Sequence, residues 1–299
     1  MASRCELPFF GSRPDLPTVA EILASKEQLS QPYGTRVVRV RDHFAVKFGQ
    51  SNALLQEGEN QLFVQESSRV PVPTVYAVFH DEKTNLNFIV QEYIPGQLLG
   101  AIWDGLSYEE KSVITSQLRR NMDELRAIPS PGYCGGLWGQ PNLDIHFGNP
   151  DRVHEPHSDS AISGPKATEE EWADTMCRRL EQREHGPAKG RPYYMTWLRR
   201  LYRIVFRGHR PVFNHGDFSP GNIMIRDDDK SAVIIDWQYS GWCPSFWEYC
   251  GAMEQLSHRS DWGEWLPKIL DELARVWDAN GPCACHRSHI VSVAKFTLF

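Results

Sequence analysis

Apolar and polar positions in the first third of the chain predict a small antiparallel sheet that carries one main helix. Residues 35–49 contain two runs rich in Val and Phe, and residues 69–96 contain two further runs separated by a polar turn. Between them, residues 52–67 have helical spacing, and residues 17–25 predict a shorter amphipathic helix. The order of strand, strand, helix, strand and strand therefore predicts a β-rich lobe with one main helix.

The pattern becomes mainly helical after Pro95 and Gly96. Ser107 and Glu110 have the spacing of a capping box, and they predict the start of a helix that ends before Pro129. The apolar stripe of this helix is predicted to comprise Ile114, Leu118, Met122 and Leu125.

Two more helices are predicted farther along the chain, within residues 168–184 and 192–208. One face of the second is predicted to carry Tyr194, Trp197, Leu198, Leu201, Ile204 and Val205. The rest of residues 132–192 is rich in Gly, Pro, His and acidic residues, and its role stays open. Together these patterns predict an α+β fold with two lobes, a small antiparallel β lobe and a larger, mostly helical lobe.

Composition and charge disfavour several classes of protein. Of the 299 residues, 41% are hydrophobic and 23% are charged, which is typical of a globular protein, and the net charge of −6 disfavours nucleic acid as a partner. No apolar run reaches the roughly 18–20 residues of a membrane-spanning helix, and no secretory signal is evident. The seven cysteines are scattered, so we expect no disulfide framework and a cytoplasmic location. The oligomeric state stays open.

A short cluster of Cys283, Cys285, His286 and His289 lies near the end of the sequence. Cys and His residues can bind zinc, but structural zinc sites usually combine two such pairs. The sequence lacks a second paired cluster, so we interpret the stretch as a polar surface segment. A metal site is the alternative.

Two apolar runs, Ile223–Ile225 and Ala232–Ile235, are flanked by polar residues that a simple hairpin does not need. Asn222 precedes the first run and Asp236 follows the second, so pairing of the strands would bring both side chains to one edge. Amide and carboxylate oxygens are the ligands that Mg²⁺ prefers when it bridges nucleotide phosphates. Asp217, just before this hairpin, can orient a hydroxyl and accept its proton. The alternative is a hairpin whose polar ends are merely solvated.

The spacing of Asp217 and Asn222, with His215 two residues before the aspartate, matches the kinase catalytic loop. The stretches "HGDFSPGNIMI" and "IIDWQYSGWCPSFWEY" resemble the aminoglycoside phosphotransferase/choline kinase family, most nearly its uncharacterised fungal members. The resemblance extends from about Arg36 to about Glu254. It implies that His215 supports the catalytic loop structurally.

The same resemblance implies a two-lobed protein-kinase-like fold. Residues 1–94 would form a nucleotide-binding lobe, and residues 95–299 a catalytic and substrate-binding lobe. The implied activity is transfer of the γ-phosphoryl group of ATP to a hydroxyl of a small molecule, with Mg²⁺ as cofactor. By this resemblance Asp217 is the catalytic base, while Asn222 and Asp236 are magnesium ligands.

The family also has a strand lysine that holds nucleotide phosphates and pairs with a helical glutamate. Lys47 matches that lysine, and an exposed strand lysine is the alternative. We choose Glu59 as its partner and keep Glu57 as the alternative, because the sequence does not separate neighbouring helix positions. The stretch around Gln91 and Tyr93 resembles the interlobe hinge, whose backbone atoms read adenine. A plain buried strand explains the same stretch equally well.

A protein kinase is the nearest alternative enzyme. Such kinases carry a glycine-rich G-x-G-x-x-G loop, a long activation segment and an A-P-E anchor. Here only "QPYGTRVV" stands in place of the loop, "CPSFWEY" follows soon after Asp236, and no A-P-E occurs. We therefore expect a small-molecule acceptor. Without the glycine pattern, the sequence does not indicate how tightly ATP is bound.

The identity of the acceptor is the least constrained part of the prediction. Trp247 and Glu248 would suit a cationic amine through cation–π attraction and ion pairing. The alternative is that Trp247 packs in the helical core. A nucleotide-binding pseudokinase or scaffold without turnover is the alternative from another class of protein. The intact set of anchoring, metal-binding and base residues argues against it, because a binder has no need of the base.

Overall fold

The computed structural model describes residues 6–13, 15–30, 34–143, 164–182, 192–205, 207–256 and 260–271. The chain forms two compact units, the first from residues 1–125 and 219–238 and the second from residues 126–218 and 239–299. This division differs from the predicted boundary between residues 94 and 95. The segment after residue 95 pairs with a later strand, and this pairing places both in the first unit.

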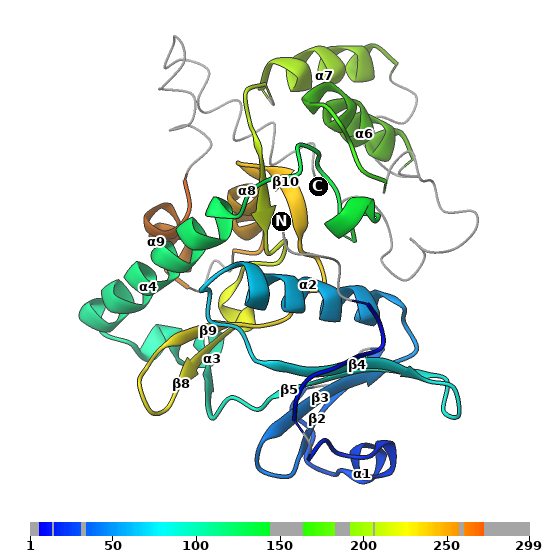
Figure 1. Cartoon of the computed structure of the whole chain (residues 1–299). Coiled ribbons are helices and arrows are strands. Elements are labelled where there is room, and N and C mark those ends of the chain that lie inside the picture. Colours follow the sequence, from blue (N-terminus) through cyan, green and yellow to red (C-terminus); the bar gives the residue numbers. More distant parts are fainter. Residues whose placement is uncertain are drawn as a thin grey trace. The chain divides into compact units, whose positions relative to one another are not determined.

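The first unit contains a five-stranded antiparallel sheet with a helix on each face (Figure 1). Its strands, in the order β1-β4-β5-β3-β2, are β1 (Phe9–Phe10), β2 (Thr35–Val40), β3 (Phe44–Gly49), β4 (Val75–Asp81) and β5 (Leu86–Glu92). Helix α1 (Val19–Ala24) packs on one face and α2 (Ala53–Ser67) on the other. The predicted antiparallel β lobe with one main helix is confirmed.

Side chains of β5 alternate between the two faces of this sheet, as a period of two requires. Phe88 and Val90 belong to the core on the α1 side, whereas Ile89 belongs to the core on the α2 side. A β-carbon at Gly58 of α2 would lie 2.6 Å from a methyl carbon of Val78 in β4. Glycine therefore permits a close approach that brings polar residues of α2 within reach of the sheet.

A second sheet of the first unit has three strands and contains the hairpin predicted from the apolar runs. Its order is β6-β8-β9, with β6 (Gly96–Leu98), β8 (Ile223–Arg226) and β9 (Ala232–Ile234). Helix α4 (Tyr108–Ala127) packs on the hairpin, because its Gln117 donates to the Lys230 carbonyl and accepts from the Ala232 amide. Short helical turns also belong here: α3 (Leu99–Ile102), η1 (Trp103–Gly105) and η5 (Pro220–Asn222).

The predicted start and stripe of α4 are both confirmed. The Ser107 amide donates to the Glu110 carboxylate at 2.8 Å, and the Glu110 amide donates to the Ser107 hydroxyl at 3.2 Å. These two bonds form the capping box. The four residues of the stripe are all buried: Ile114, Leu118, Met122 and Leu125.

The second unit combines a two-stranded sheet with helices. Its elements are η2 (Leu137–Gly139), α6 (Glu169–Gln182), α7 (Pro192–Val205), β7 (Pro211–Asn214), β10 (Gly241–Pro244), α8 (Trp247–Glu254) and α9 (Trp262–Ile269). Strands β7 and β10 pair antiparallel, and α6 lies beside α7 (Figure 1). A core cluster of this unit includes Trp172, Met176, Leu198, Tyr202, Phe246 and Trp247.

The buried face of α7 differs from the predicted one. Trp197 and Ile204 are 49% and 62% exposed, although both were expected on the buried face. Met195, Leu198 and Tyr202 are buried instead, at spacings of three and four residues. The helix is apolar around much of its circumference, so the contact with α6, rather than the periodicity, decides which side is covered.

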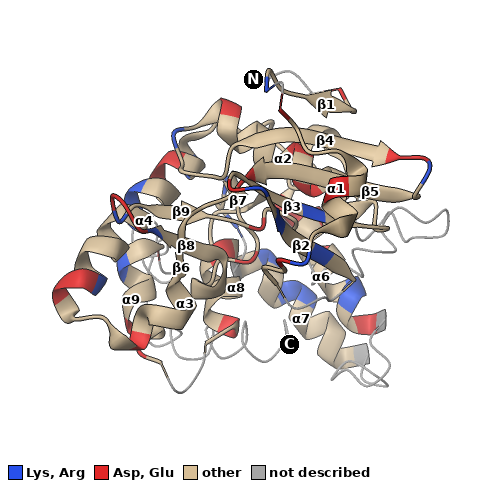
Figure 2. Ribbon diagram, turned by 90° about the horizontal axis from the view of Figure 1, so that it is seen from below, with Lys and Arg blue, Asp and Glu red and all other residues tan. Residues whose placement is uncertain are grey.

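Charged residues of both signs are interspersed along the helices and strands (Figure 2). Among the described residues, no helix combines the length and apolar composition needed to cross a membrane. Within the same part of the chain, no group of three or more His, Cys, Asp or Glu side chains could hold a metal ion. The Cys283–His289 cluster lies outside the described residues.

Candidate active site

The β8–β9 hairpin brings Asn222 and Asp236 to the same edge. Ile223 of β8 lies opposite Ile234 of β9, and the Ile235 amide donates to the Asn222 carbonyl at 3.0 Å. The predicted pairing of the two apolar runs is therefore confirmed. A side-chain amide oxygen and a carboxylate at one edge are hard oxygen donors that suit a divalent cation such as Mg²⁺.

Lys47 of β3 connects this edge to helix α2. Its ammonium group lies 2.7 Å from a carboxylate oxygen of Glu57 and 3.0 Å from one of Asp236. The Lys47 and Glu57 side chains are almost fully buried, whereas the Asp236 side chain is 41% exposed. The result is a charged network that extends from inside the first unit to solvent.

The partner of Lys47 is thus Glu57, the alternative, and the choice of Glu59 is corrected. Two residues correspond to about 200° of rotation around an α-helix, so neighbouring glutamates of this spacing face different directions. Both glutamates are buried, and burial alone therefore does not separate them. The ion pair with the sheet identifies the residue that faces Lys47.

Burial and pairing oppose each other in the titration of this network. Burial lowers the pKa of Lys47, but attraction to Glu57 and Asp236 outweighs it, so the net pKa is raised and the lysine stays cationic. Burial is also the largest influence on Glu57 and raises its pKa to about 7, although Lys47 acts in the opposite direction. The Lys47 ammonium therefore keeps its charge between the two carboxyl groups.

Asp236 has a left-handed backbone conformation, with φ of 64°. Such a conformation costs about 1 kcal/mol or more for a residue with a side chain, although Asp and Asn tolerate it better than most. Strain of this kind persists where surrounding contacts hold it, and it is common at functional sites.

The segment that contains Asp217 belongs to the second unit and is held by a buried carboxylate. Glu248 of α8 accepts hydrogen bonds from the amides of His215, at 2.5 Å, and Gly216, at 3.1 Å. Burial raises the pKa of Glu248, while His215, Arg126 and the two amides lower it by a smaller amount. Nearby charges and backbone amides together thus compensate the carboxylate in this unit.

Gly216 has no acceptable replacement in this loop. Its φ is 85°, and a β-carbon there would lie 2.2 Å from the Tyr239 carbonyl oxygen. The loop also bonds to the next segment of the second unit, because the Ser240 hydroxyl donates to the His215 carbonyl at 2.9 Å. These contacts fix the backbone immediately before Asp217.

Asp217 is half-buried and bonds to His215 and Gln255 of the second unit. Its amide donates to Nδ1 of His215 at 3.3 Å, a contact in which the buried histidine braces the loop from inside. The Gln255 side-chain amide donates to the Asp217 carboxylate at 2.6 Å. In the second of these bonds a neutral donor orients the carboxylate.

Trp247 and Glu248, predicted to contact the substrate, are buried instead. The Trp247 ring packs edge-on against Trp172 with ring centroids 5.1 Å apart, in the core between α6 and α8. The Glu248 carboxylate binds the backbone amides of His215 and Gly216. The substrate prediction for both is corrected, because core packing and loop bracing account for the two side chains.

Several polar groups around Gln91 and Tyr93, the stretch that resembles the interlobe hinge, are already bonded within the first unit. The Tyr93 amide donates to the His43 carbonyl at 2.8 Å, and the Gln91 side chain accepts from Gln61 at 2.8 Å. The Arg39 guanidinium lies over the Tyr93 ring, 4.2 Å from its centroid. The Tyr93 amide is therefore already used as a donor within the first unit, and the reading of adenine by backbone atoms around Gln91 and Tyr93 stays a prediction.

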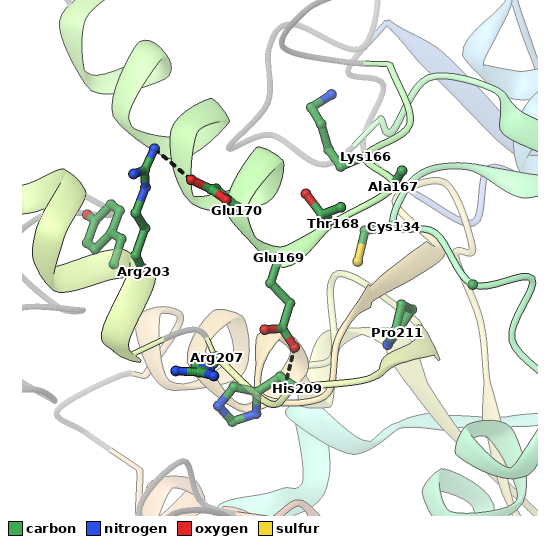
Figure 3. Close-up of a pocket in the computed structure, with 12 residues that line it drawn as sticks. Cys134, Lys166, Ala167, Thr168, Glu169, Glu170, Arg203, Arg207, His209 and Pro211 are labelled. Carbon is green, nitrogen blue, oxygen red and sulfur yellow. Dashed lines mark hydrogen bonds and ion pairs between the residues drawn. The ribbon is translucent and has the colours of Figure 1, made fainter.

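A cavity of about 620 Å³ lies in the second unit and is lined by none of the predicted site residues (Figure 3). Its acidic groups already have partners. The Glu169 carboxylate accepts from the amides of Gly208 and His209, and Glu170 pairs with Arg203 at 3.0 Å. Burial, the largest influence, raises the pKa of the Cys134 thiol in its wall to about 12, so that thiol is protonated. The cavity holds no activated nucleophile among these groups.

Two contacts of the site were not predicted from the sequence. Gln255 is a single exposed polar residue after α8, and no sequence pattern indicates its bond to Asp217. Asn60 of α2, which is completely buried, donates to the Trp237 carbonyl at 2.9 Å. Asn60 lies three residues after Glu57, so the two share one face of the helix. This spacing would have pointed to Asn60 only if Glu57 had been taken as the partner of Lys47.

Comparison with known proteins identifies relatives at the level of family and fold. A model of the phosphotransferase enzyme family matches residues 27–283. A search of the curated proteins finds no match to this sequence.

Three solved structures of aminoglycoside phosphotransferases are similar in fold. The GDP complex of aminoglycoside 2'-phosphotransferase-IIIa has 17% identity and a TM-score of 0.56, over 91% of this chain and 81% of that one. A thermostable mutant of APH(4)-Ia, in a ternary complex with AMP-PNP and hygromycin B, has 14% identity and a TM-score of 0.55, over 91% and 82%. ADP-bound APH(2'')-Ib has 14% identity and a TM-score of 0.53, over 91% and 92%.

Proposed function

This chain belongs to the phosphotransferase enzyme family and is a small-molecule kinase, and from that premise we propose how its residues divide the reaction. Lys47 anchors the phosphates of ATP, Asn222 and Asp236 hold a magnesium ion, and Asp217 serves the acceptor hydroxyl. The observation that carries the proposal is the meeting of Asn222 and Asp236 at one hairpin edge, with Lys47 bonded to Asp236.

The first task is to hold the triphosphate. Lys47 stays protonated because Glu57 and Asp236 compensate its burial, so it offers a fixed cation to phosphate oxygens. Glu57 orients this cation from α2. When bound, magnesium would neutralise charge on the phosphates, and the oxygen donors of Asn222 and Asp236 suit that ion.

The second task is to deliver the acceptor. Asp217 accepts a hydrogen bond from the acceptor hydroxyl and takes its proton as the hydroxyl oxygen attacks the γ-phosphorus. The new bond joins this oxygen to phosphorus, the bond from phosphorus to the β,γ-bridging oxygen breaks, and ADP leaves. Catalysis by this set is mainly positioning and charge stabilisation, with no covalent enzyme intermediate.

The acceptor is proposed only as a small molecule that carries a hydroxyl group. Since Trp247 and Glu248 are engaged in the core and the loop, they give no support for an amine-bearing acceptor. Support for an amine comes from fold relatives such as APH(4)-Ia, whose structure contains hygromycin B. Amino alcohols, aminoglycosides and sugars therefore form the set to screen.

The test is ADP release by the full-length protein with each acceptor, in the presence of magnesium and after its removal with EDTA. We expect release that needs both the acceptor and the metal, and ³¹P NMR should detect a phosphomonoester product. Asp236→Ala should abolish turnover. Metal-independent ADP release, or phosphorylation of a peptide hydroxyl alone, would contradict the proposal. Nucleotide binding without any turnover would favour a pseudokinase.

A further inference from the structure

The backbone around Asp236 is closed by hydrogen bonds from its own neighbours. Asp236 has a φ of 64°, a conformation that needs support. Before it, the Ile235 amide donates to the Asn222 carbonyl at 3.0 Å. After it, the Trp237 indole N–H reaches back to the Ile234 carbonyl at 3.1 Å. The left-handed residue therefore lies inside a small hydrogen-bonded loop.

A side chain from another element completes this loop. Asn60 lies in the middle of α2, is completely buried, and donates from Nδ2 to the Trp237 carbonyl at 2.9 Å. Asparagine is a poor helix former, and its amide is costly to bury without hydrogen bonds. A position that served packing alone would favour an apolar residue. The amide is therefore explained by the carbonyl that it binds.

Helix α2 reaches the Asp236 segment by two routes. Glu57 binds Lys47, which binds the Asp236 carboxylate at 3.0 Å. Asn60, three residues later on the same face of the helix, binds the backbone carbonyl that follows Asp236. One route sets the position of the side chain by charge, and the other sets the backbone conformation by a hydrogen bond.

We propose that Asn60 is a positioning residue that keeps Asp236 in the conformation in which its carboxylate serves the metal beside Asn222. This inference rests on the proposed metal-binding role of Asp236. Asn60 itself touches neither nucleotide nor metal. When its hydrogen bond is removed, Asp236 is free to relax toward the more common right-handed or extended conformations, and its carboxylate moves away from the edge shared with Asn222.

The experiment compares Asn60→Ala and Asn60→Asp with Gln65→Ala as a matched control. Gln65 also lies on α2 and accepts from the Val75 amide at 2.8 Å, so its loss weakens the helix without touching the Asp236 segment. Calorimetry measures ADP binding with magnesium and with EDTA. Substitution of a residue that holds a metal ligand in place typically lowers metal affinity by roughly 10–100-fold. Both Asn60 variants should therefore bind ADP in the presence of magnesium about tenfold more weakly than wild type.

The control and the metal-free measurements decide the interpretation. ADP binding in EDTA should stay within about twofold of wild type, and Gln65→Ala should match wild type in both conditions. In turnover, the Asn60 variants should need about tenfold more magnesium for half-maximal rate with an unchanged KM for the acceptor. Asn60→Asp preserves the shape but offers no donor when ionised, and Asn60→Ser, which keeps a donor, should recover part of the affinity.

Two results would count against the inference, and they differ. Equal ADP affinity with magnesium in wild type and the Asn60 variants, or an equal loss with and without metal, would reduce Asn60 to a structural residue. Wild-type binding that ignores magnesium would instead overturn the metal-binding role of Asp236, and with it both the proposed function and this inference.

Discussion

Each of the two units contains a buried glutamate next to predicted site residues, and the two units compensate its charge in different ways. Glu57 in the first unit faces the Lys47 ammonium, whereas Glu248 in the second accepts two backbone amides. Burial raises the pKa of both carboxyl groups. In the first unit the carboxylate is paired with a cation that we propose binds phosphate, and in the second unit the carboxylate holds a loop in one shape.

The residues next to each glutamate follow this division. In the first unit the network continues through Lys47 to Asp236, whose side chain is partly exposed. In the second unit Glu248 is buried, and the loop that it holds contains Asp217, which accepts a hydrogen bond from the neutral Gln255 side chain. Substitutions of Lys47 and Glu57 should therefore act on ligand affinity and pH dependence, and substitution of Glu248 on loop stability.

Among the substitutions that compare the two forms of charge compensation, we expect the largest effect at Lys47 of the first unit. Lys47→Met removes the phosphate anchor, and we expect kcat/KM for ATP to fall by about 10³-fold, equivalent to about 4 kcal/mol. Lys47→Arg should recover little, because a planar guanidinium does not occupy the space of an ammonium. Initial rates over a range of ATP concentrations measure this. A loss below tenfold would show that the network is structural.

Removal of the buried Glu248 carboxylate should lower the stability of the fold. Glu248→Ala leaves the amides of His215 and Gly216 buried without their acceptor, so we expect the free energy of unfolding to fall by about 2–4 kcal/mol. Glu254→Ala, on the exposed side of the same helix, should change it by about 0.5 kcal/mol or less. Urea denaturation measures both. Equal stabilities of the two variants would mean that the backbone contacts of Glu248 carry little weight.

The pH dependence of stability tests the compensation of Glu57 in the first unit. The folded pKa of Glu57, about 7, exceeds its ordinary value of 4.5, so between these values the folded chain binds a proton that the unfolded chain releases. Glu57 thereby adds up to about 3 kcal/mol to the free energy of unfolding. This stabilisation is fully present below pH 4.5 and is lost as the pH rises through 7. Glu57→Gln should flatten the curve of unfolding free energy over this range. An unchanged slope in urea titrations would contradict it.

The smallest effect is expected at Gln255. Its bond to Asp217 is exposed, so Gln255→Ala should lower kcat by about threefold to tenfold through a less oriented base, about 1 kcal/mol. The affinity for ADP and the unfolding free energy should be unchanged. Steady-state kinetics with saturating ATP measures the effect. A change in nucleotide affinity instead of kcat would place Gln255 in a different role.

Much of the first unit could be predicted because its signals are local. Strand alternation in residues 35–49, the capping box at Ser107 and the paired runs around Asn222 and Asp236 all depend on a few neighbouring positions. The hairpin edge followed directly, since antiparallel pairing of two short strands brings their outer ends together. The prediction that Asn222 and Asp236 meet needed no information from the rest of the chain.

The errors arose where packing decides between similar residues. Helix α2 is buried around nearly all of its circumference from Ala53 to Val64, so periodicity does not indicate which glutamate faces Lys47. Helix α7 has more apolar residues than its packing neighbours can cover, so Trp197 remains exposed. Trp247 follows the general rule that tryptophan packs inside, and it lost its predicted substrate role for that reason.

The most direct test of the central claim is the turnover of Asp217→Asn with the best acceptor, measured together with calorimetric binding of ADP and magnesium. The substitution keeps the shape of the side chain but removes the base. The account predicts a loss of about 10³-fold or more in kcat, with ADP affinity within about twofold of wild type. Turnover within tenfold of wild type would contradict it, because phosphoryl transfer would then proceed without Asp217 as the base.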